Sequence, residues 1–140
     1  MNDAAVRELV GAARVGRLGT VTPAGAPHLV PCCFALDGDV VYTAVDGKPK
    51  TTRDLRRLAN VRANPACSLL VDHYDEDWTA VWWVRVDGTG RLLESGPEHA
   101  RALDVLRAKY EQYALVALDG AVIAIDVHTW RGWSAVDGVS

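Results

Sequence analysis

The stretch that decides the fold is residues 15–45, VGRLGTVTPAGAPHLVPCCFALDGDVVYTAV. β-Branched residues recur through it, and two turn signals, Pro23-Ala24-Gly25 and Asp37-Gly38-Asp39, divide it into three parts. The pattern predicts strands over residues 15–22, 27–36 and 40–45. Short turns between consecutive strands are typical of an antiparallel sheet, so we expect the domain to begin with a meander.

The rest of the chain combines further strands with helical segments. Strands are predicted over residues 67–74, 79–93 and 121–127, and helices over residues 3–13, 51–60 and from the capping box Ser95-x-x-Glu98 onward. Gly88 and Gly90 predict a bend or bulge in the longest strand. We therefore expect one domain, residues 1–140, with a mainly β (α+β) fold: a six-stranded antiparallel barrel with peripheral helices, because closing a sheet removes its exposed edges.

The basic residues are concentrated in one stretch. The net charge is −3, but residues 48–62 carry six Lys or Arg side chains and one acid, which leaves −8 on the remainder. A single basic stretch on an acidic chain does not fit a nucleic-acid-binding face, which needs a basic domain. Two interpretations stay open: a pocket for a compact anion such as phosphate, and a solvated helix face.

The familiar catalytic and metal-binding motifs are absent from the sequence. It has no Gly-x-Ser-x-Gly, Walker loop or Gly-x-Gly-x-x-Gly, and its His and Cys residues lack metal-ligand spacing, so no metal site is predicted. Cys32 and Cys33 are adjacent, which is a poor disulfide pair, and we interpret both as packing residues. The sequence shows no signal peptide or membrane-spanning run, and a reduced, cytoplasmic protein without membrane contact is expected.

Six further segments follow one another in a recognisable order: Gly16–Val21, Gly25–Pro31, Asp37–Asp39, Asn60–Leu69, Trp83–Gly88 and Trp130–Trp133. Together they resemble the split β-barrel flavin-binding superfamily, also called pyridoxamine-phosphate-oxidase-like, over nearly the whole chain. The similarity is greatest to the small actinobacterial-type branch that uses the deazaflavin coenzyme F420 in place of FMN. The resemblance implies a six-stranded antiparallel split β-barrel that forms a homodimer, with the cofactor between the two subunits.

The resemblance also implies which residues bind the cofactor. The basic pair before Asn64-Pro65 corresponds to the family's phosphate-binding pair, which assigns Arg56 and Arg57 to the phosphate. Lys48 and Lys50 match extra basic residues that the deazaflavin branch uses for the phosphate and the acidic tail. The ring system would be lined by a hairpin that pairs residues 27–31 with 40–44, and by a C-terminal aromatic: His28, Val30, Pro31, Tyr42, Thr43 and Trp133. Guanidinium forks suit phosphate oxygens, and a flat ring needs an apolar slot with a few polar groups.

We therefore expect an oxidoreductase that transfers a hydride from reduced F420 to a small unsaturated organic substrate. In such enzymes the cofactor carries the chemistry, so no protein residue is assigned a catalytic role. Two alternatives are kept: an FMN-dependent reductase or oxidase of the same fold, and a flavin-binding carrier without turnover. Trp78, Trp130 and Trp133 are candidates for a subunit interface or a ring-stacking wall, whereas one of Trp82 and Trp83 should pack in the core.

Overall fold

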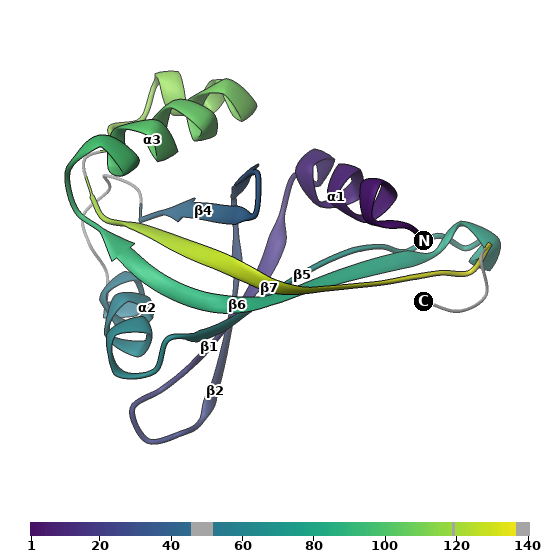
Figure 1. The fold of residues 1–140 in the computed structure, drawn as a ribbon, viewed down its shortest axis with the longest axis horizontal. Coiled ribbons are helices and arrows are strands. Elements are labelled where there is room, and N and C mark those ends of the chain that lie inside the picture. The colour runs from purple at the N-terminus through teal and green to yellow at the C-terminus, as the bar shows by residue number, and fades with distance from the viewer. Residues whose placement is uncertain (46–51, 119, 137–140) are drawn as a thin grey trace.

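The computed structural model describes residues 1–45, 52–118 and 120–136 and shows a mainly β fold with three α-helices (Figure 1). The strands are β1 (Gly16–Val21), β2 (Pro27–Cys32), β3 (Ala35–Asp37), β4 (Val40–Ala44), β5 (Ala66–His73), β6 (Trp82–Leu93) and β7 (Val122–Ser134). The helices are α1 (Asp3–Ala12), α2 (Thr52–Ala63) and α3 (Pro97–Lys109), with short 3₁₀ turns η1 (Trp78–Ala80) and η2 (Glu111–Ala114). None of the helices in these ranges has the length and apolarity needed to cross a membrane. The mainly β prediction is confirmed, but the described chain has seven strands rather than six.

All seven strands belong to one antiparallel sheet, in the order β2-β1-β5-β6-β7-β4-β3. β2 and β3 are its opposite edges, although only Cys33 and Phe34 separate them in the chain. The sheet must curl so that this link can join its two edges, which makes it a half-barrel. We call this link the seam. The predicted pairing of residues 27–31 with 40–44 is wrong, because β2 pairs with β1 while β4 lies between β3 and β7.

The seam is held by the C-terminal end of α3. Phe34 is fully buried, and its backbone N–H donates to the hydroxyl of Tyr110 at 3.1 Å. The same hydroxyl lies 3.0 Å from the carbonyl oxygens of Phe34 and Arg14. Lys109 donates to the Phe34 carbonyl at 2.8 Å, and burial, followed by the nearby Arg14, lowers the pKa of this amine to about 8. The side chains of Tyr110 and Lys109 thus bond the backbone of Phe34, where the ladder of strand hydrogen bonds is interrupted. The predicted strand 27–36 is therefore divided into β2 and β3.

The side chains pack in two clusters on opposite faces of the sheet. Ile123 and Ile125 of β7 face the interior of the half-barrel, where α1 and α2 add Val10 and Val61. The alternate residues of β7 face the other way and pack under α3, together with Leu106. In the view of Figure 1, α1 and α3 are drawn above the long β6–β7 ribbon, and α2 is drawn below it.

The ends of two elements differ from the predictions. β7 continues to Ser134 instead of ending at residue 127, because a bulge between Asp87 and Gly88 lets β6 stay paired with it along its whole length. The N-cap of α3 is Gly96, whose φ of 97° suits glycine, and no side chain caps the helix. The predicted capping box is therefore wrong. Glu98 instead accepts hydrogen bonds from other elements of the fold.

Glu98 joins α3 to β4 and β6. Its carboxylate accepts two hydrogen bonds of 2.8 Å from Arg91 and one of 2.9 Å from the Tyr42 hydroxyl. Arg91 also binds Asp126 of β7 at 2.6 Å. The hydrogen bonds from Arg91, followed in size of effect by the one from Tyr42, lower the pKa of Glu98 to about 2.

We expect Glu98→Gln to lower the stability near neutral pH and to do so less as the pH falls. An unfolded Glu titrates at about 4.3, so the stabilisation by the ionised carboxylate is complete above that pH and is lost as the pH falls toward 2. Because Arg91 and Glu98 are 38% and 39% exposed, the expected loss at pH 7 is only about 1 kcal/mol. Urea denaturation of both proteins at pH 7, 5 and 3.5 measures it, and a difference that is as large at pH 3.5 as at pH 7 would contradict this account.

Candidate functional site

A pocket of about 160 Å³ lies at the seam, and we call it the seam pocket. It is lined by Pro31, Cys32, Cys33, Thr43, Ala44, Arg57 and Tyr113. The Thr43 hydroxyl donates to the carbonyl of Cys33 at 2.8 Å, which fixes β4 against the link. The charge of Arg57 lies close enough to Cys32 to oppose the rise in the pKa of that thiol. Pockets for whole organic ligands measure about 300–1,000 Å³, so this one suits a compact anionic group rather than a complete cofactor.

The adjacent cysteines have different surroundings. Cys32 is 8% exposed, and burial raises the pKa of its thiol despite a hydrogen bond with Thr43. Cys67 is also buried, and desolvation raises its pKa to about 11. Cys33 is exposed. The interpretation as a packing residue therefore fits Cys32, whereas Cys33 supplies an accessible thiol beside Arg57.

We expect one of the three thiols to react rapidly with a disulfide reagent such as DTNB in the native protein at pH 8. The rapid thiol should be Cys33, because the other two are buried and their raised pKa values leave little thiolate. Cys33→Ser should abolish the rapid phase, while Cys67→Ser should leave it unchanged. A rapid phase that survives Cys33→Ser would show that this exposure assignment is wrong.

Of the residues predicted to bind the cofactor, the structure brings together Pro31, Thr43 and Arg57 in the seam pocket. Arg56 precedes Arg57 on α2, is exposed and does not line the pocket. Lys48 and Lys50 lie outside the described residues. Within the described residues, the two adjacent arginines of the basic stretch therefore differ. Arg57 lines the pocket, whereas Arg56 is exposed to solvent.

The other predicted residues of β2 face away from Pro31. Residues alternate across a strand, so His28 and Val30 face the interior of the half-barrel while Pro31 faces outward. Val30 packs against the cluster inside the half-barrel, here called the main core. Nδ1 of His28 is buried and has no hydrogen-bond partner among the residues that the structure describes.

Tyr42 and Trp133 are also separate from the seam pocket. Tyr42 packs under α3, where burial, followed by its hydrogen bond to Glu98, raises its pKa to about 12. Trp133 pairs with Trp83 across β6 and β7, near the far end of β7. Trp130, another predicted interface residue, packs against the core below Arg7, whose guanidinium is 4.5 Å from the ring centre.

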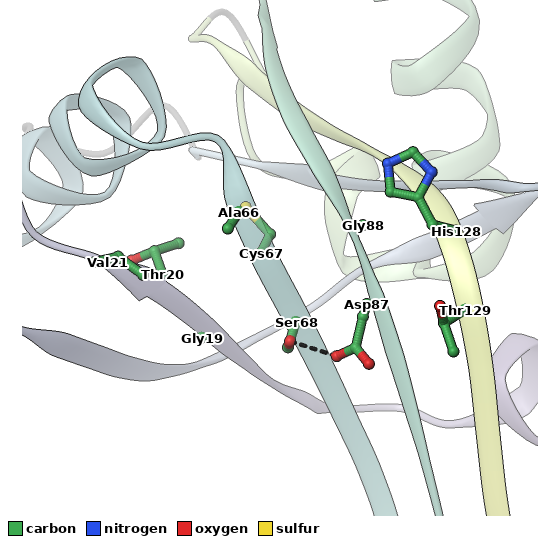
Figure 2. A pocket seen from close by; sticks show the side chains of 10 residues that line it. All are labelled: Gly19, Thr20, Val21, Ala66, Cys67, Ser68, Asp87, Gly88, His128 and Thr129. Atoms are coloured by element: carbon green, nitrogen blue, oxygen red, sulfur yellow. Dashed lines mark hydrogen bonds between the residues drawn. The ribbon is translucent and has the colours of Figure 1, made fainter. Parts of the chain in front are cut away.

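A larger cavity of about 430 Å³ lies on the face of β1, β5, β6 and β7 that points away from the half-barrel interior, here called the outer face. Its lining residues are Gly19, Thr20, Val21, Ala66, Cys67, Ser68, Asp87, Gly88, His128 and Thr129 (Figure 2). Figure 2 shows the carboxylate of Asp87 turned toward Ser68, whose hydroxyl donates to it at 2.6 Å. The same carboxylate oxygen also accepts from Nε of Arg85 at 3.1 Å.

A third cavity, of about 420 Å³, lies farther along the same strands and includes Arg85, Leu70 and Trp83. Arg85 and Asp87 are alternate residues of β6, so the two large cavities open on one face of the sheet. Trp82 belongs to the opposite side and packs on the main core, which confirms the prediction that one of the two adjacent tryptophans does so. Sequence reasoning missed these cavities, because strand alternation identifies outward residues but not which strands lie side by side.

One protein-family model and several solved structures resemble the chain. A family model described as pyridoxamine 5'-phosphate oxidase matches residues 3–134, and no curated protein sequence matches the chain. A conserved hypothetical protein, Rv2991 from Mycobacterium tuberculosis, superposes with a TM-score of 0.79 and 21% identity, covering 96% of this chain and 86% of that one.

Two further structures of the same fold carry functional names. An F420 reductase has a TM-score of 0.63 and 22% identity, covering 89% of this chain and 94% of that one. HutZ, the heme storage protein from Vibrio cholerae, has a TM-score of 0.70 and 13% identity, covering 94% and 93%. Likeness at these identities shows the fold alone. Because the family model spans nearly every residue of the half-barrel, the chain belongs to the pyridoxamine 5'-phosphate oxidase family.

Proposed function

We propose that the protein is an F420-dependent oxidoreductase that reduces a small unsaturated organic substrate. The observation that carries this proposal is the seam pocket, where Arg57 and Thr43 lie beside the outward-facing Pro31. A guanidinium fork and a hydroxyl suit the oxygens of a phosphate group. A phosphate held there would leave the rest of the cofactor at the edge of the outer face.

The outer face offers space for the flat ring. It carries a cavity of about 430 Å³ for the ring, and a second cavity of about 420 Å³ beside Trp83 leaves space for a substrate. One 140-residue chain has little structure left to enclose a large ligand, so we propose that a second copy covers this face. When bound, the deazaflavin supplies the hydride, and the chain's own residues bind the phosphate, orient the ring and exclude water. Sedimentation velocity tests the dimer.

The second candidate is a binding protein without turnover, with FMN or another flavin-like ligand in the same place. Among the described residues, no carboxylate or imidazole lines the seam pocket that could act as an acid or base. HutZ, named as a heme storage protein, has the same fold. An FMN-dependent enzyme is the remaining alternative within the fold.

The decisive experiment titrates the purified full chain with F420 and, separately, with FMN, and follows tryptophan fluorescence and the rate of Cys33 labelling. We expect F420 to bind more tightly and to slow the labelling, because its phosphate would occupy the pocket that Cys33 lines. Tight FMN binding without F420 binding would overturn the deazaflavin assignment. Oxidation of reduced F420 is then measured with a panel of unsaturated substrates, and F420 binding without any substrate-dependent oxidation would support the carrier.

A further inference from the structure

The strand register places several charged side chains on one line across the outer face. Arg17 of β1 lies opposite Leu70 of β5, Leu70 opposite Arg85 of β6, and Arg85 opposite Arg131 of β7. Residues directly opposite each other in an antiparallel pair face the same side. We call these three arginines the arginine row.

The charges of the arginine row are only partly balanced. Arg17 forms an ion pair with Asp72 at 2.9 Å, and Nε of Arg85 contacts Asp87 at 3.1 Å. Arg131 is exposed, and in the part of the chain that the structure describes no carboxylate lies within ion-pair distance of it. Like charges directly opposite each other on a sheet repel, so the pair Arg85 and Arg131 favours an anion that can lie between them.

The next outward residues on the same two strands are aromatic. Trp83 lies two residues before Arg85, and its cross-strand partner is Trp133, two residues after Arg131. Arg85 and Trp83 both line the cavity of about 420 Å³, together with Leu70 and with Asp72, whose carboxylate is paired with Arg17. The place where an anion would balance the arginines is therefore adjacent to indole rings and to an apolar cavity.

We propose that Arg85 and Arg131, flanked by Trp83 and Trp133, bind the anionic group of a planar organic acid, with its ring in the adjoining cavity. Guanidinium groups bind carboxylates through paired hydrogen bonds, and indoles pack well against flat rings. A neutral planar compound would leave the charge of Arg131 unbalanced, and an inorganic anion would leave the cavity unfilled. This inference rests on the proposed function, because it names the substrate class of that oxidoreductase as aromatic or conjugated carboxylates.

The test uses equilibrium dialysis of the full chain with 2-naphthoate as the probe and 2-naphthamide as its neutral counterpart. We expect the acid to bind about tenfold more tightly than the amide, because a charged hydrogen bond is lost with the amide. Arg131→Gln and Arg85→Gln should each weaken naphthoate binding about five- to twentyfold, since both sites are partly exposed to solvent. The control Arg107→Gln, on the exposed surface of α3, should change nothing.

Three results would overturn the inference. They are equal binding of the acid and the amide, unchanged naphthoate binding in both arginine variants, and displacement of naphthoate by inorganic phosphate that binds as tightly as naphthoate does. Near-UV circular dichroism of each variant shows that the fold is retained. The same variants are titrated with F420. F420 binding without selective naphthoate binding would reject this inference but not the proposed function. Selective naphthoate binding without any cofactor binding would reject the proposed oxidoreductase but retain the anion site.

Discussion

Replacing Tyr110 with Phe should lower the free energy of unfolding by about 2–3 kcal/mol, although only one oxygen atom is removed. That oxygen accepts the N–H of the fully buried Phe34 and lies 3.0 Å from the carbonyls of Phe34 and Arg14. Tyr110 itself is 6% exposed, so water cannot take the place of the hydroxyl. The Phe34 N–H would then be buried without a partner, which is the costly part of the change.

Tyr74→Phe is the matched control. The hydroxyl of Tyr74 accepts only a 3.4 Å contact from Trp78, and this side chain is 63% exposed, so the expected change is below about 0.5 kcal/mol. Urea denaturation followed by tryptophan fluorescence measures both variants. If Tyr110→Phe and Tyr74→Phe were equally stable, the seam would not depend on this hydroxyl.

Arg57→Ala should weaken binding of the phosphate-bearing cofactor by about 1–3 kcal/mol, which is about a 5- to 150-fold rise in Kd. Arg57 is the arginine that lines the seam pocket, and no other described side chain with a fixed positive charge lines it. Neither Thr43 nor Pro31 can replace its charge. Fluorescence titration with F420, or with FMN if that is the ligand, measures the effect, and raised ionic strength should reduce it.

Arg56→Ala serves as the control on the same helix. Arg56 has the same charge but is exposed and does not line the pocket, so its removal should change the Kd less than about threefold, as expected for a screened surface charge. An equal loss in the two variants would mean that the phosphate lies along α2 instead of inside the seam pocket. The sequence-based assignment gave the two arginines the same role, so this pair of variants separates the two accounts.

The sequence predicted the strands well where turn signals divide them and poorly where they do not. Asp37-Gly38-Asp39 marks the turn between β3 and β4, and Gly38 adopts a φ of 61° there. No such signal marks the break at Cys33 and Phe34, because that corner is stabilised by Tyr110, which lies 76 positions away from Phe34 in the sequence. A local pattern cannot report a bond of that range.

The same limit explains why the sequence predicted the site only in part. Strand alternation predicts that His28 and Pro31 face opposite sides, but it does not tell which side carries the pocket. Tyr42 matched the family pattern, yet its hydroxyl is engaged by Glu98, which the sequence placed in a capping box. Thr43 of β4 and Arg57 of α2 meet at the seam pocket only in the folded chain.

The two-residue seam also affects the order in which the chain can fold. β1 and β2 are neighbours in sequence and can pair early, as can β3 and β4, whereas pairing of β4 with β7 joins Tyr42 to Ala124, about 80 positions away. Contacts of that range form late, because a long loop must close first. Since the seam ties the two early hairpins together, they cannot occupy opposite edges of the sheet until β7 has docked. We therefore expect the entry of the C-terminal strand to be the slow step of folding. A nascent chain that lacks β7 should remain an open sheet in which β4 and β6 each have an unpaired edge.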